Sequence, residues 1–330
     1  MVKTKYIWFN GKFVKWEQAK VHVLIHALHY GSGVFEGMRC YKTQNGPAVF
    51  RLKDHIDRLF NSAKCLQMKI PFKKGEIQKA ITDLIKINKI DECYIRPILF
   101  YGYGKMGLNP KGLRVDCAIA AWPWGKYLKE KVKVKISKFI RLHPKSVVSS
   151  AKVCGYYVNS IFATIEAKKF KFDEALLLDW RGFVAEGPGE NIFIVKKKTL
   201  FTPTLKNVLP GITRDSIIKI AKDEGYKVIE KDISLKELKE CDEAFFTGTA
   251  AEITPIFQID RKIINHGKVG LITKLLQEKF YKIVHGEEKK YIKWLTFVSL
   301  DRQNFKKVEN LNCNLNDKKR IFYYKTHPPN

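Results

Sequence analysis

The sequence predicts an α+β protein of two domains followed by a basic extension. Three observations predict it. The chain has 330 residues, of which 45% are hydrophobic, which is enough for two cores. Strand and helix patterns mix before a Trp-Pro-Trp-Gly segment, and many short strands with few helices follow it. We place a small domain at residues 1–121, a connection at 122–131, a large domain at 132–297 and the extension at 298–330.

The small domain combines two hairpins, two helices and two core strands. Apolar segments flank Asn10-Gly11 and again residues 44–47, which are hairpin signals. A helix is expected from Asp54, as N-cap, to Leu66, and a second over 76–88, because apolar residues recur there at helical spacing. Core strands are expected over 94–101 and 115–122.

The large domain is predicted to be barrel-like or strongly curved, because its strands are many and short. A strand is expected over 132–140, and a helix follows Lys152 through Lys168. The other expected strands are 174–179, 183–186, 191–195, 199–202, 227–230, 243–247 and 252–259, and the other helices are 212–224, 234–240 and 267–284. The tail after residue 297 lacks apolar periodicity, and we expect it to be poorly ordered.

The formal charge of +28 is diffuse. Residues 298–330 hold seven Lys/Arg against three Asp/Glu, a net of +4, which leaves +24 for the other 297 residues. Clustered charge with interleaved aromatic residues would indicate a nucleic-acid partner. The diffuse charge favours solvated polar faces, so a nucleic-acid-binding protein remains only a distant alternative.

Cysteines and hydropathy indicate the compartment. Seven scattered cysteines without a CxxC motif favour a reducing, cytoplasmic setting and argue against a zinc site or a disulfide framework. No run of 18 apolar residues occurs, and the N-terminus has no apolar core of a secretory signal. We therefore expect no membrane partner and no metal.

The chemistry concentrates around Lys152, which lies among small and apolar residues and is followed by Tyr156 and Tyr157. A glycine-rich turn further on carries Glu186 and Glu190. A lysine, a phenol and a carboxylate can hold pyridoxal phosphate: the lysine forms the imine, the carboxylate keeps the pyridine nitrogen protonated, and the phenol binds the ring oxygen. Alone, this pattern fits a solvent-exposed lysine before a helix equally well, and the two glutamates are interchangeable.

Two glycine-containing turns could hold a phosphate. Residues 209–216, LPGITRDS, open a helix, where free amides and the Thr213 hydroxyl would form an anion cup. Residues 247–252, TGTAAE, form a second turn of small residues. By itself, the first turn is more often an ordinary helix start. The run GSGVFEG at 31–37 does not lie between a strand and a helix of a βαβ unit, which argues against a dinucleotide loop.

Together these segments resemble a known family. In family order between Tyr6 and Trp294, the chain is similar to the branched-chain-amino-acid aminotransferases of the fold type IV pyridoxal-phosphate enzymes. The resemblance implies a small α/β sandwich-like domain and a larger barrel-like domain. The segments that carry it are YIWFNG, AKVHVLIHALHYGSGVFEGMRCY, FRLKDHIDRLFNSAK, YIRPILF, AAWPWGKYL, EALLLD, EGPGEN, LPGITRD and TGTAAEITP.

The resemblance implies roles for particular residues. Lys152 would be the catalytic, Schiff-base lysine. Glu186 would face the ring nitrogen, and Glu190 would support the glycine-rich turn that carries both glutamates. The residues implied to hold pyridoxal 5′-phosphate are Lys152, Arg58, Tyr157, Glu186, Ile212, Thr213, Gly248 and Thr249. Those implied to hold the substrate are Phe35, Tyr94, Arg96, Trp124, Tyr127, Thr249, Ala250 and, from the partner subunit, Tyr30. One departure is Tyr156, where the family commonly has Asn.

The resemblance also implies the reaction: transamination between L-leucine, L-isoleucine or L-valine and 2-oxoglutarate, the last step of branched-chain amino-acid biosynthesis. The partners would be small amino acids and 2-oxo acids, in a homodimer or a higher homo-oligomer such as a hexamer. A D-amino-acid aminotransferase, an aminodeoxychorismate lyase of the same fold and an inactive scaffold are the alternatives.

Overall fold

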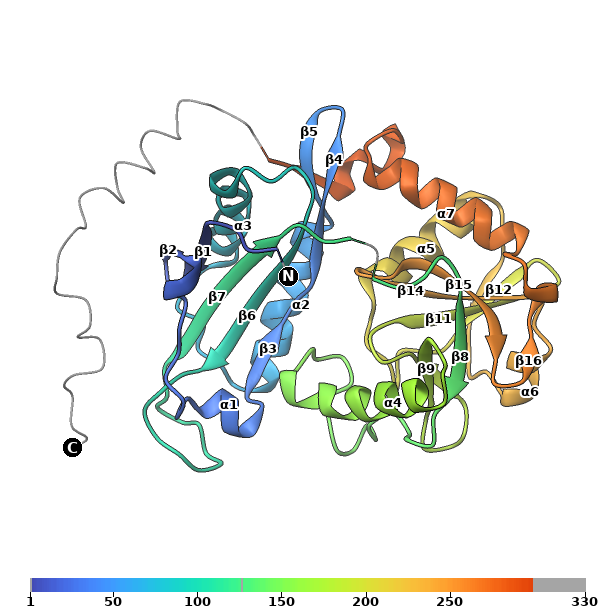
Figure 1. The fold of residues 1–330 in the computed structure, drawn as a ribbon, viewed down its shortest axis with the longest axis horizontal. Coiled ribbons are helices and arrows are strands. Elements are labelled where there is room, and N and C mark those ends of the chain that lie inside the picture. Colours follow the sequence, from blue (N-terminus) through green and yellow to red (C-terminus); the bar gives the residue numbers. More distant parts are fainter. Residues whose placement is uncertain (1, 126, 299–330) are drawn as a thin grey trace. The chain divides into compact units, whose positions relative to one another are not determined.

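The computed structural model describes residues 2–125 and 127–298. Residues 1–298 form one compact unit. Apart from Val298, the predicted basic extension lies outside the described residues. The described part contains two separate sheets, one of which closes into a barrel, and this confirms the α+β class (Figure 1).

The first sheet is antiparallel, in the order β17-β5-β4-β6-β7-β1-β2, with β3 paired to β6. Both predicted hairpins are present in it, as β1–β2 and β4–β5. The last strand, β17, returns from the far end of the chain to pair with β5. The bounds are β1 (Tyr6–Phe9), β2 (Lys12–Lys15), β3 (Gly33–Phe35), β4 (Met38–Thr43), β5 (Gly46–Phe50), β6 (Cys93–Tyr101), β7 (Val115–Trp122) and β17 (Leu295–Phe297).

Two helices, α2 (Leu52–Cys65) and α3 (Lys74–Asn88), pack on this sheet, and the short α1 (His26–Tyr30) precedes β3. Ile56, Leu59 and Ile81 are fully buried in the shared core, and each such burial is worth about 1.5–3 kcal/mol. The predicted N-cap at Asp54 is wrong. The helix begins earlier, after Arg51 in the left-handed conformation (φ 52°), since the His55 amide already donates to the Arg51 carbonyl. Asp54 lies inside the first turn, where its carboxylate binds the Arg51 guanidinium instead of capping the helix.

The second sheet closes into a six-stranded barrel, which confirms the barrel-like prediction. The order is β10-β9-β8-β15-β14-β11, and β10 also pairs with β11. Strands β12 and β13 extend the sheet from β11, and β16 pairs with β15. The bounds are β8 (Val132–Ile136), β9 (Glu174–Leu178), β10 (Val184–Glu186), β11 (Asn191–Lys196), β12 (Thr199–Thr202), β13 (Val228–Glu230), β14 (Glu243–Gly248), β15 (Glu252–Ile259) and β16 (Lys262–Ile263).

Four helices accompany the barrel: α4 (Tyr157–Lys169), α5 (Ile212–Asp223), α6 (Leu235–Lys239) and α7 (Leu271–Val284). Side chains of α5 and α7, among them Ile217 and Leu276, share a core with β11 and β14. The N-terminal end of α4 points towards β3 of the first sheet (Figure 1), where Val153 forms an isolated bridge with Val34. The start of α4 therefore lies between the two sheets.

Besides the start of α2 and shifts of one or two residues elsewhere, two element boundaries differ more widely from the prediction. The strand expected over 132–140 ends at Ile136, and irregular chain follows to Val153. The helix expected from 267 begins at Leu271, because residues 265–267 form a 3₁₀ turn with His266 at φ 51°. Within residues 2–125 and 127–298, no helix is long and apolar enough to span a membrane and no metal-ligand cluster occurs. The division into domains at 121 and 132 stays a prediction.

Candidate active site

Lys152 is fixed on both sides of its backbone. Its amide donates to Ser62 Oγ of α2 (2.9 Å), and its carbonyl accepts from the amide of Phe35 in β3 (3.1 Å). The 3₁₀ turn Cys154–Tyr156 then reverses the chain into α4. A Cβ on Gly31 would lie only 2.7 Å from Gly155 Cα of this turn. The close approach of the two segments therefore requires a glycine at position 31. As a result, Lys152 Nζ lies 2.5 Å from the Tyr157 hydroxyl.

Glu186, at the end of β10, is buried and surrounded by donors. Arg141 Nε donates to it at 2.6 Å, Asn191 Nδ2 at 3.0 Å and the amide of Leu209 at 3.1 Å. Burial raises the pKa of Glu186 above its ordinary value, while the Arg141 guanidinium acts in the opposite direction. The carboxylate is therefore held in one place by the first residue of β11 and by two irregular segments, one after β8 and one before α5.

Glu190 differs from Glu186 in its surroundings. It is also buried, but its side chain accepts a hydrogen bond from the neighbouring Gly189 amide (3.1 Å) instead of from an arginine. Burial, together with the nearby Glu174, raises the pKa of Glu190 to about 8. Because burial favours the protonated form of Glu190, whereas Arg141 binds the ionised form of Glu186, the two glutamates that the residues alone left interchangeable are chemically distinct.

The start of α5, where we expect the anion cup, leaves backbone amides outside the helix ladder. The first helical bond runs from the Asp215 amide to the Gly211 carbonyl, so the amides of Ile212 and Thr213 precede the helix ladder. A Cβ on Gly211 would lie 1.9 Å from Asn191 Oδ1, so the backbone approaches closely here. The hollow beside it, about 460 Å³, is also lined by residues 247–250 and Arg58.

Arg58 reaches this cup from α2 and is held by Glu36. Arg58 Nε and Nη2 donate to the two Glu36 oxygens (2.6 and 2.8 Å), and Nη1 donates to the Pro210 carbonyl (2.8 Å). Glu36 is completely buried and also contacts His55 Nδ1 (2.7 Å). Although burial opposes it, the Arg58 charge holds the pKa of Glu36 well below its ordinary value, whereas burial lowers the pKa of His55. Glu36 is thus an ionised acceptor and His55 a neutral donor.

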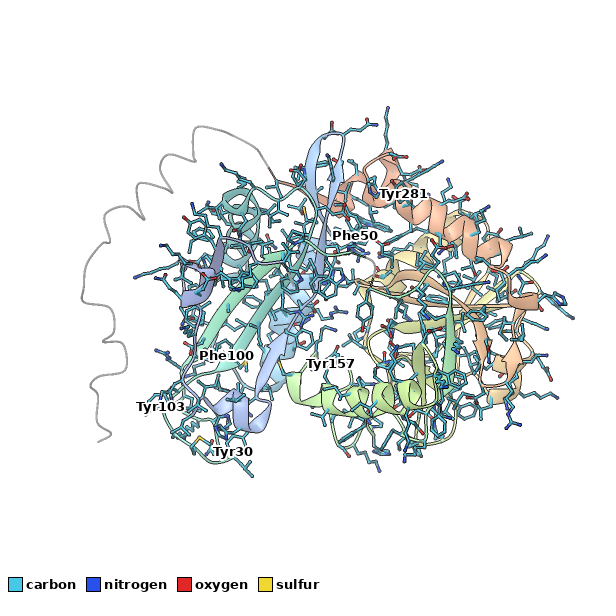
Figure 2. The ribbon with its side chains drawn as sticks, viewed as in Figure 1. Tyr30, Phe50, Phe100, Tyr103, Tyr157 and Tyr281 are labelled. Carbon is cyan, nitrogen blue, oxygen red and sulfur yellow. The ribbon has the colours of Figure 1, made fainter. Side chains whose placement is uncertain are left out.

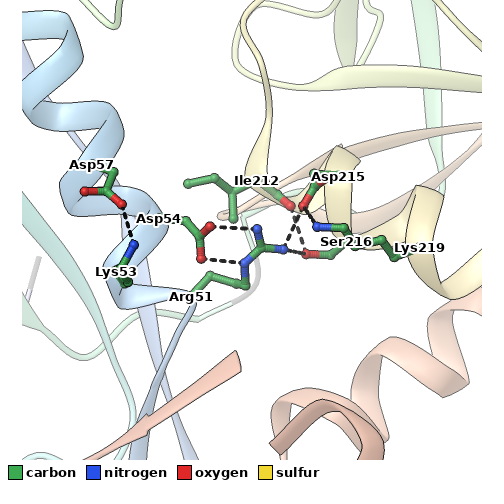
Figure 3. A network of polar contacts seen from close by, with 8 residues as sticks. All are labelled: Arg51, Lys53, Asp54, Asp57, Ile212, Asp215, Ser216 and Lys219. Carbon is green, nitrogen blue, oxygen red and sulfur yellow. Dashed lines mark hydrogen bonds and ion pairs between the residues drawn. The ribbon is translucent and has the colours of Figure 1, made fainter. Parts of the chain in front are cut away.

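A second arginine joins α2 to α5 (Figure 3). Arg51 donates to both oxygens of Asp54 on its own helix, and to Asp215 (2.9 Å) and Ser216 (3.1 Å) on α5. Its guanidinium also lies over the Trp294 ring (5.1 Å). This buried arginine fixes the helix that bears the anion cup relative to the helix that bears Arg58.

Aromatic side chains continue from the lysine. The Phe35 ring lies 4.9 Å from Tyr157 and 4.7 Å from the Arg96 guanidinium. Arg96 Nη2 donates to the Tyr94 hydroxyl (3.3 Å). Tyr94 leads to Trp124 (5.0 Å between centroids), which stacks on Tyr127 at 6.4 Å. A continuous wall is thus formed by Arg96 with four aromatic residues, Phe35, Tyr94, Trp124 and Tyr127.

Tyr30 is not part of this wall. Its hydroxyl accepts from the Gly107 amide (3.2 Å), its side chain is exposed, and Figure 2 separates it clearly from Tyr157. The other implied site residues line two hollows, of about 410 and 460 Å³, that share Lys152, Asn191 and Leu209. The exceptions are Phe35, Arg96, Trp124 and Tyr127, which line neither hollow and form the wall.

These hollows fit pyridoxal phosphate. One contains helix-start amides beside Arg58, and the other contains a buried carboxylate, with the amine and phenol between them. Within the described residues, the buried Thr247 Oγ1 in the first hollow has no hydrogen-bond partner, as expected where a ligand oxygen would complete the site. The donor set matches a phosphate at one end and a pyridine nitrogen at the other.

Comparison with known proteins agrees with this chemistry. The family model for amino-transferase class IV matches residues 33–259. Branched-chain-amino-acid aminotransferases of Pseudomonas aeruginosa (strain PAO1) and Escherichia coli (strain K12) are 46% and 43% identical to the chain, and the matches cover 88% and 90% of it and 97% and 98% of the relatives. The chain belongs to the branched-chain-amino-acid aminotransferase family of the class IV aminotransferases.

Solved structures support the same conclusion. The branched-chain aminotransferase of the thermophilic archaeon Thermoproteus uzoniensis has a TM-score of 0.87 at 43% identity, and the match covers 90% of this chain and all of that one. Another branched-chain amino acid aminotransferase, with a TM-score of 0.88 at 44% identity, is known with pyridoxamine 5′-phosphate and with N-(5′-phosphopyridoxyl)-L-glutamate. The predicted family, fold type and cofactor are confirmed, and these relatives give no support to the D-amino-acid aminotransferase or lyase alternatives.

Sequence reasoning missed three residues of the site: Arg141, Glu36 and Asn191. Arg141 directly follows the strand expected over 132–140, and Glu36 and Asn191 lie in or beside the quoted motifs without a role of their own. Two of them have partners distant in sequence, since Glu36 is 22 residues from Arg58 and Arg141 is 45 from Glu186. Asn191 is only five residues from Glu186 and pairs with it across the hairpin, so the EGPGEN turn could have indicated this contact.

Proposed function

We propose that the chain catalyses reversible transamination between L-leucine, L-isoleucine or L-valine and 2-oxoglutarate, with pyridoxal 5′-phosphate as cofactor. The observation that carries the proposal is the 2.5 Å contact between Lys152 Nζ and the Tyr157 hydroxyl, set between a buried carboxylate and an anion cup. When bound, pyridoxal 5′-phosphate supplies an electron sink for charge that develops at the substrate α-carbon.

The residues then divide the work. Lys152 Nζ would hold the cofactor and, when free, would take up and return the substrate's α-proton. Tyr157 would hydrogen-bond the ring oxygen, and Glu186 would keep the proton at the ring nitrogen. The amides of Ile212 and Thr213, with Arg58, Gly248 and Thr249, would hold the phosphate.

The aromatic wall gives the substrate specificity. Phe35, Trp124 and Tyr127 offer apolar surface to a branched side chain, while Tyr94 and the turn Thr249-Ala250 position the α-carboxylate. Arg96 at the edge of this wall binds the side-chain carboxylate of glutamate, so one pocket accepts both kinds of substrate. Burial leaves Arg96 Nε without a partner among the described residues, which favours a ligand contact there.

The proposal includes a cytoplasmic homodimer in which Tyr30 of the partner subunit completes the substrate pocket. Two observations support it. Tyr30 is exposed and lies apart from its own chain's site. Helix α4, next to the lysine, exposes Val158, Ile161, Phe162 and Ile165, each by half or more, and such an apolar face is typical of an interface. The six described cysteines are free, which agrees with a reducing compartment.

An absorbance spectrum of the purified protein before and after addition of L-leucine tests the proposal. We expect a long-wavelength band of lysine-bound cofactor that L-leucine converts to a shorter-wavelength form. Lys152→Ala should lose both the band and turnover, whereas Lys145→Ala, an exposed lysine of the same irregular segment, should keep both. Full activity of Lys152→Ala would refute the assignment.

A further inference from the structure

Arg141 is held in the active site by its surroundings, although it lies in irregular chain. Its amide donates to the Leu178 carbonyl at the end of β9 (2.7 Å). The neighbouring Ile140 carbonyl accepts from Asn159 of α4 (3.0 Å), and His143 packs on the Trp180 ring (5.0 Å between centroids). The side chain is 13% exposed and lines the same hollow as Lys152 and Glu186. The segment therefore places a fixed cation directly beside the carboxylate.

We propose that Arg141 is a positioning residue that makes Glu186 a poor proton acceptor, so that the proton between Glu186 and the cofactor's ring nitrogen stays on the nitrogen. This inference rests on the proposed function, because it assumes that Glu186 faces that nitrogen. Arg141 would then act on the ring nitrogen only through the Glu186 side chain.

The proton shared by Glu186 and the ring nitrogen can rest on either group. A protonated ring nitrogen is the stronger electron sink, so the reaction needs the proton on the nitrogen. A buried carboxylate gains proton affinity through desolvation, which favours transfer of the proton to Glu186. Donors that bind the ionised form oppose this, and the charged donor opposes it most. Arg141 is the charged donor to Glu186, at 2.6 Å; Asn191 and the Leu209 amide are neutral.

The other titratable groups around Glu186 do not replace Arg141. Lys152 also favours the ionised carboxylate, but it is a smaller influence than Arg141 and its nitrogen is occupied by the cofactor in the resting enzyme. Glu190 is a carboxyl whose pKa is raised by burial, and it offers no positive charge. Without Arg141, the desolvation of Glu186 would be opposed mainly by two neutral hydrogen bonds.

The test compares Arg141→Met and Arg141→Lys in the holoenzyme, with Arg114→Met as the matched control. Arg114 forms a comparable arginine–carboxylate pair, with Asp116 at 3.1 Å, outside both hollows. For Arg141→Met we expect kcat with L-leucine to fall about tenfold to a hundredfold, the size of one charge-assisted hydrogen bond, with KM changed less than about threefold. Arg141→Lys should restore part of kcat, because it returns the charge.

A second readout separates this role from a structural one. The pKa that governs the pH-dependent absorbance of the lysine-bound cofactor should rise in Arg141→Met, because positive charge is lost from the ring and its surroundings. In a Glu186→Gln background, the same substitution should change kcat by less than about threefold, because the residue through which Arg141 acts is gone. If Arg141→Met does not fold, Arg141→Gln, which is uncharged but polar, replaces it in every comparison.

The outcomes are distinct. An unchanged kcat and unchanged absorbance pKa in the arginine variant would overturn the inference, as would equal losses in the Glu186 and Glu186→Gln backgrounds. An unmodified protein with no lysine-bound cofactor, or with no activity on L-leucine, would instead overturn the proposed function.

Discussion

Replacing Glu36 by Gln should destabilise the protein strongly without removing any apolar contact. Glu36 is fully buried, and its two oxygens accept from Arg58 Nε, Arg58 Nη2 and His55 Nδ1, with a longer contact from the Gly37 amide at 3.3 Å. A glutamine amide offers one acceptor oxygen, so its NH₂ group must face a donor in either orientation. The Arg58 charge is then left buried without its counter-ion. Breaking a buried ion pair in this way costs about 3–5 kcal/mol.

The assay is denaturant unfolding followed by tryptophan fluorescence. The matched control is Glu17→Gln, which removes a glutamate from an exposed ion pair with Lys3 (3.6 Å, both side chains 67% exposed) and should change the free energy of unfolding by less than about 1 kcal/mol. A loss for Glu36→Gln no larger than that of the control would refute the reasoning. A Glu36→Leu, Arg58→Met double variant should recover much of the stability, because it leaves no unpaired charge.

Glu36 should make the free energy of unfolding fall as the pH is lowered. The pKa of Glu36 is lower in the folded protein than in the unfolded chain, where it is about 4.3. Glu36 therefore stabilises the fold fully above the unfolded pKa, and this stabilisation is lost as the pH falls from there towards the folded pKa. The wild-type protein should lose stability on acidification more steeply than Glu36→Gln, measured by unfolding midpoints between pH 6 and pH 3.

Three further predictions concern the turns and the interhelical bridge. Gly211→Ala should clash with Asn191, which should cost about 1–3 kcal/mol of stability and speed the release of cofactor during gel filtration. Gly75→Ala is the control: its Cβ meets nothing within 4 Å, so stability and cofactor release should stay unchanged. Burial raises the pKa of Glu190 to about 8, so between about pH 4.3 and pH 8 the folded protein keeps a proton that the unfolded chain has lost. The stability of the wild type should therefore fall between pH 5 and pH 8 more than that of Glu190→Gln. Arg51→Met removes the bridge between α2 and α5, and we expect a loss of about 1–3 kcal/mol in urea unfolding; an unchanged midpoint would contradict it.

Local sequence patterns predicted most of the helices and strands and the central residues of the candidate site. The hairpin turn at Asn10-Gly11, the helix face of Ile56 and Leu59, and the turn before α5 each depend on neighbours within a few residues. For the same reason Lys152 and Tyr157 can be paired from the sequence. The roles of the individual site residues remain predictions, although the chain brings all of them except Tyr30 around the two hollows and the adjoining aromatic wall.

Long-range pairing accounts for what local patterns missed. The helix start at Arg51 depends partly on Asp215, which lies 164 residues away and holds the arginine together with Asp54. Strand β17 pairs with β5 across most of the chain, so nothing in its own sequence indicates the first sheet. Likewise, the strand expected through residue 140 ends at Ile136, because the chain turns to bring Arg141 to Glu186.

The net charge of +28 does not describe the electrostatics of the candidate site. Two buried ion pairs of the site are formed before any ligand arrives: Glu36 binds Arg58, and Arg141 binds Glu186. Burial raises the pKa of Glu190, whose side chain accepts from a backbone amide and not from a cation. A phosphate dianion therefore enters a cup that offers amide dipoles and a neutralised arginine rather than a strong excess of positive charge, so its binding should depend on the helix-start geometry more than on ionic strength. The surface lysines set the total charge, but the geometry of these few buried pairs sets the electrostatics of the reaction.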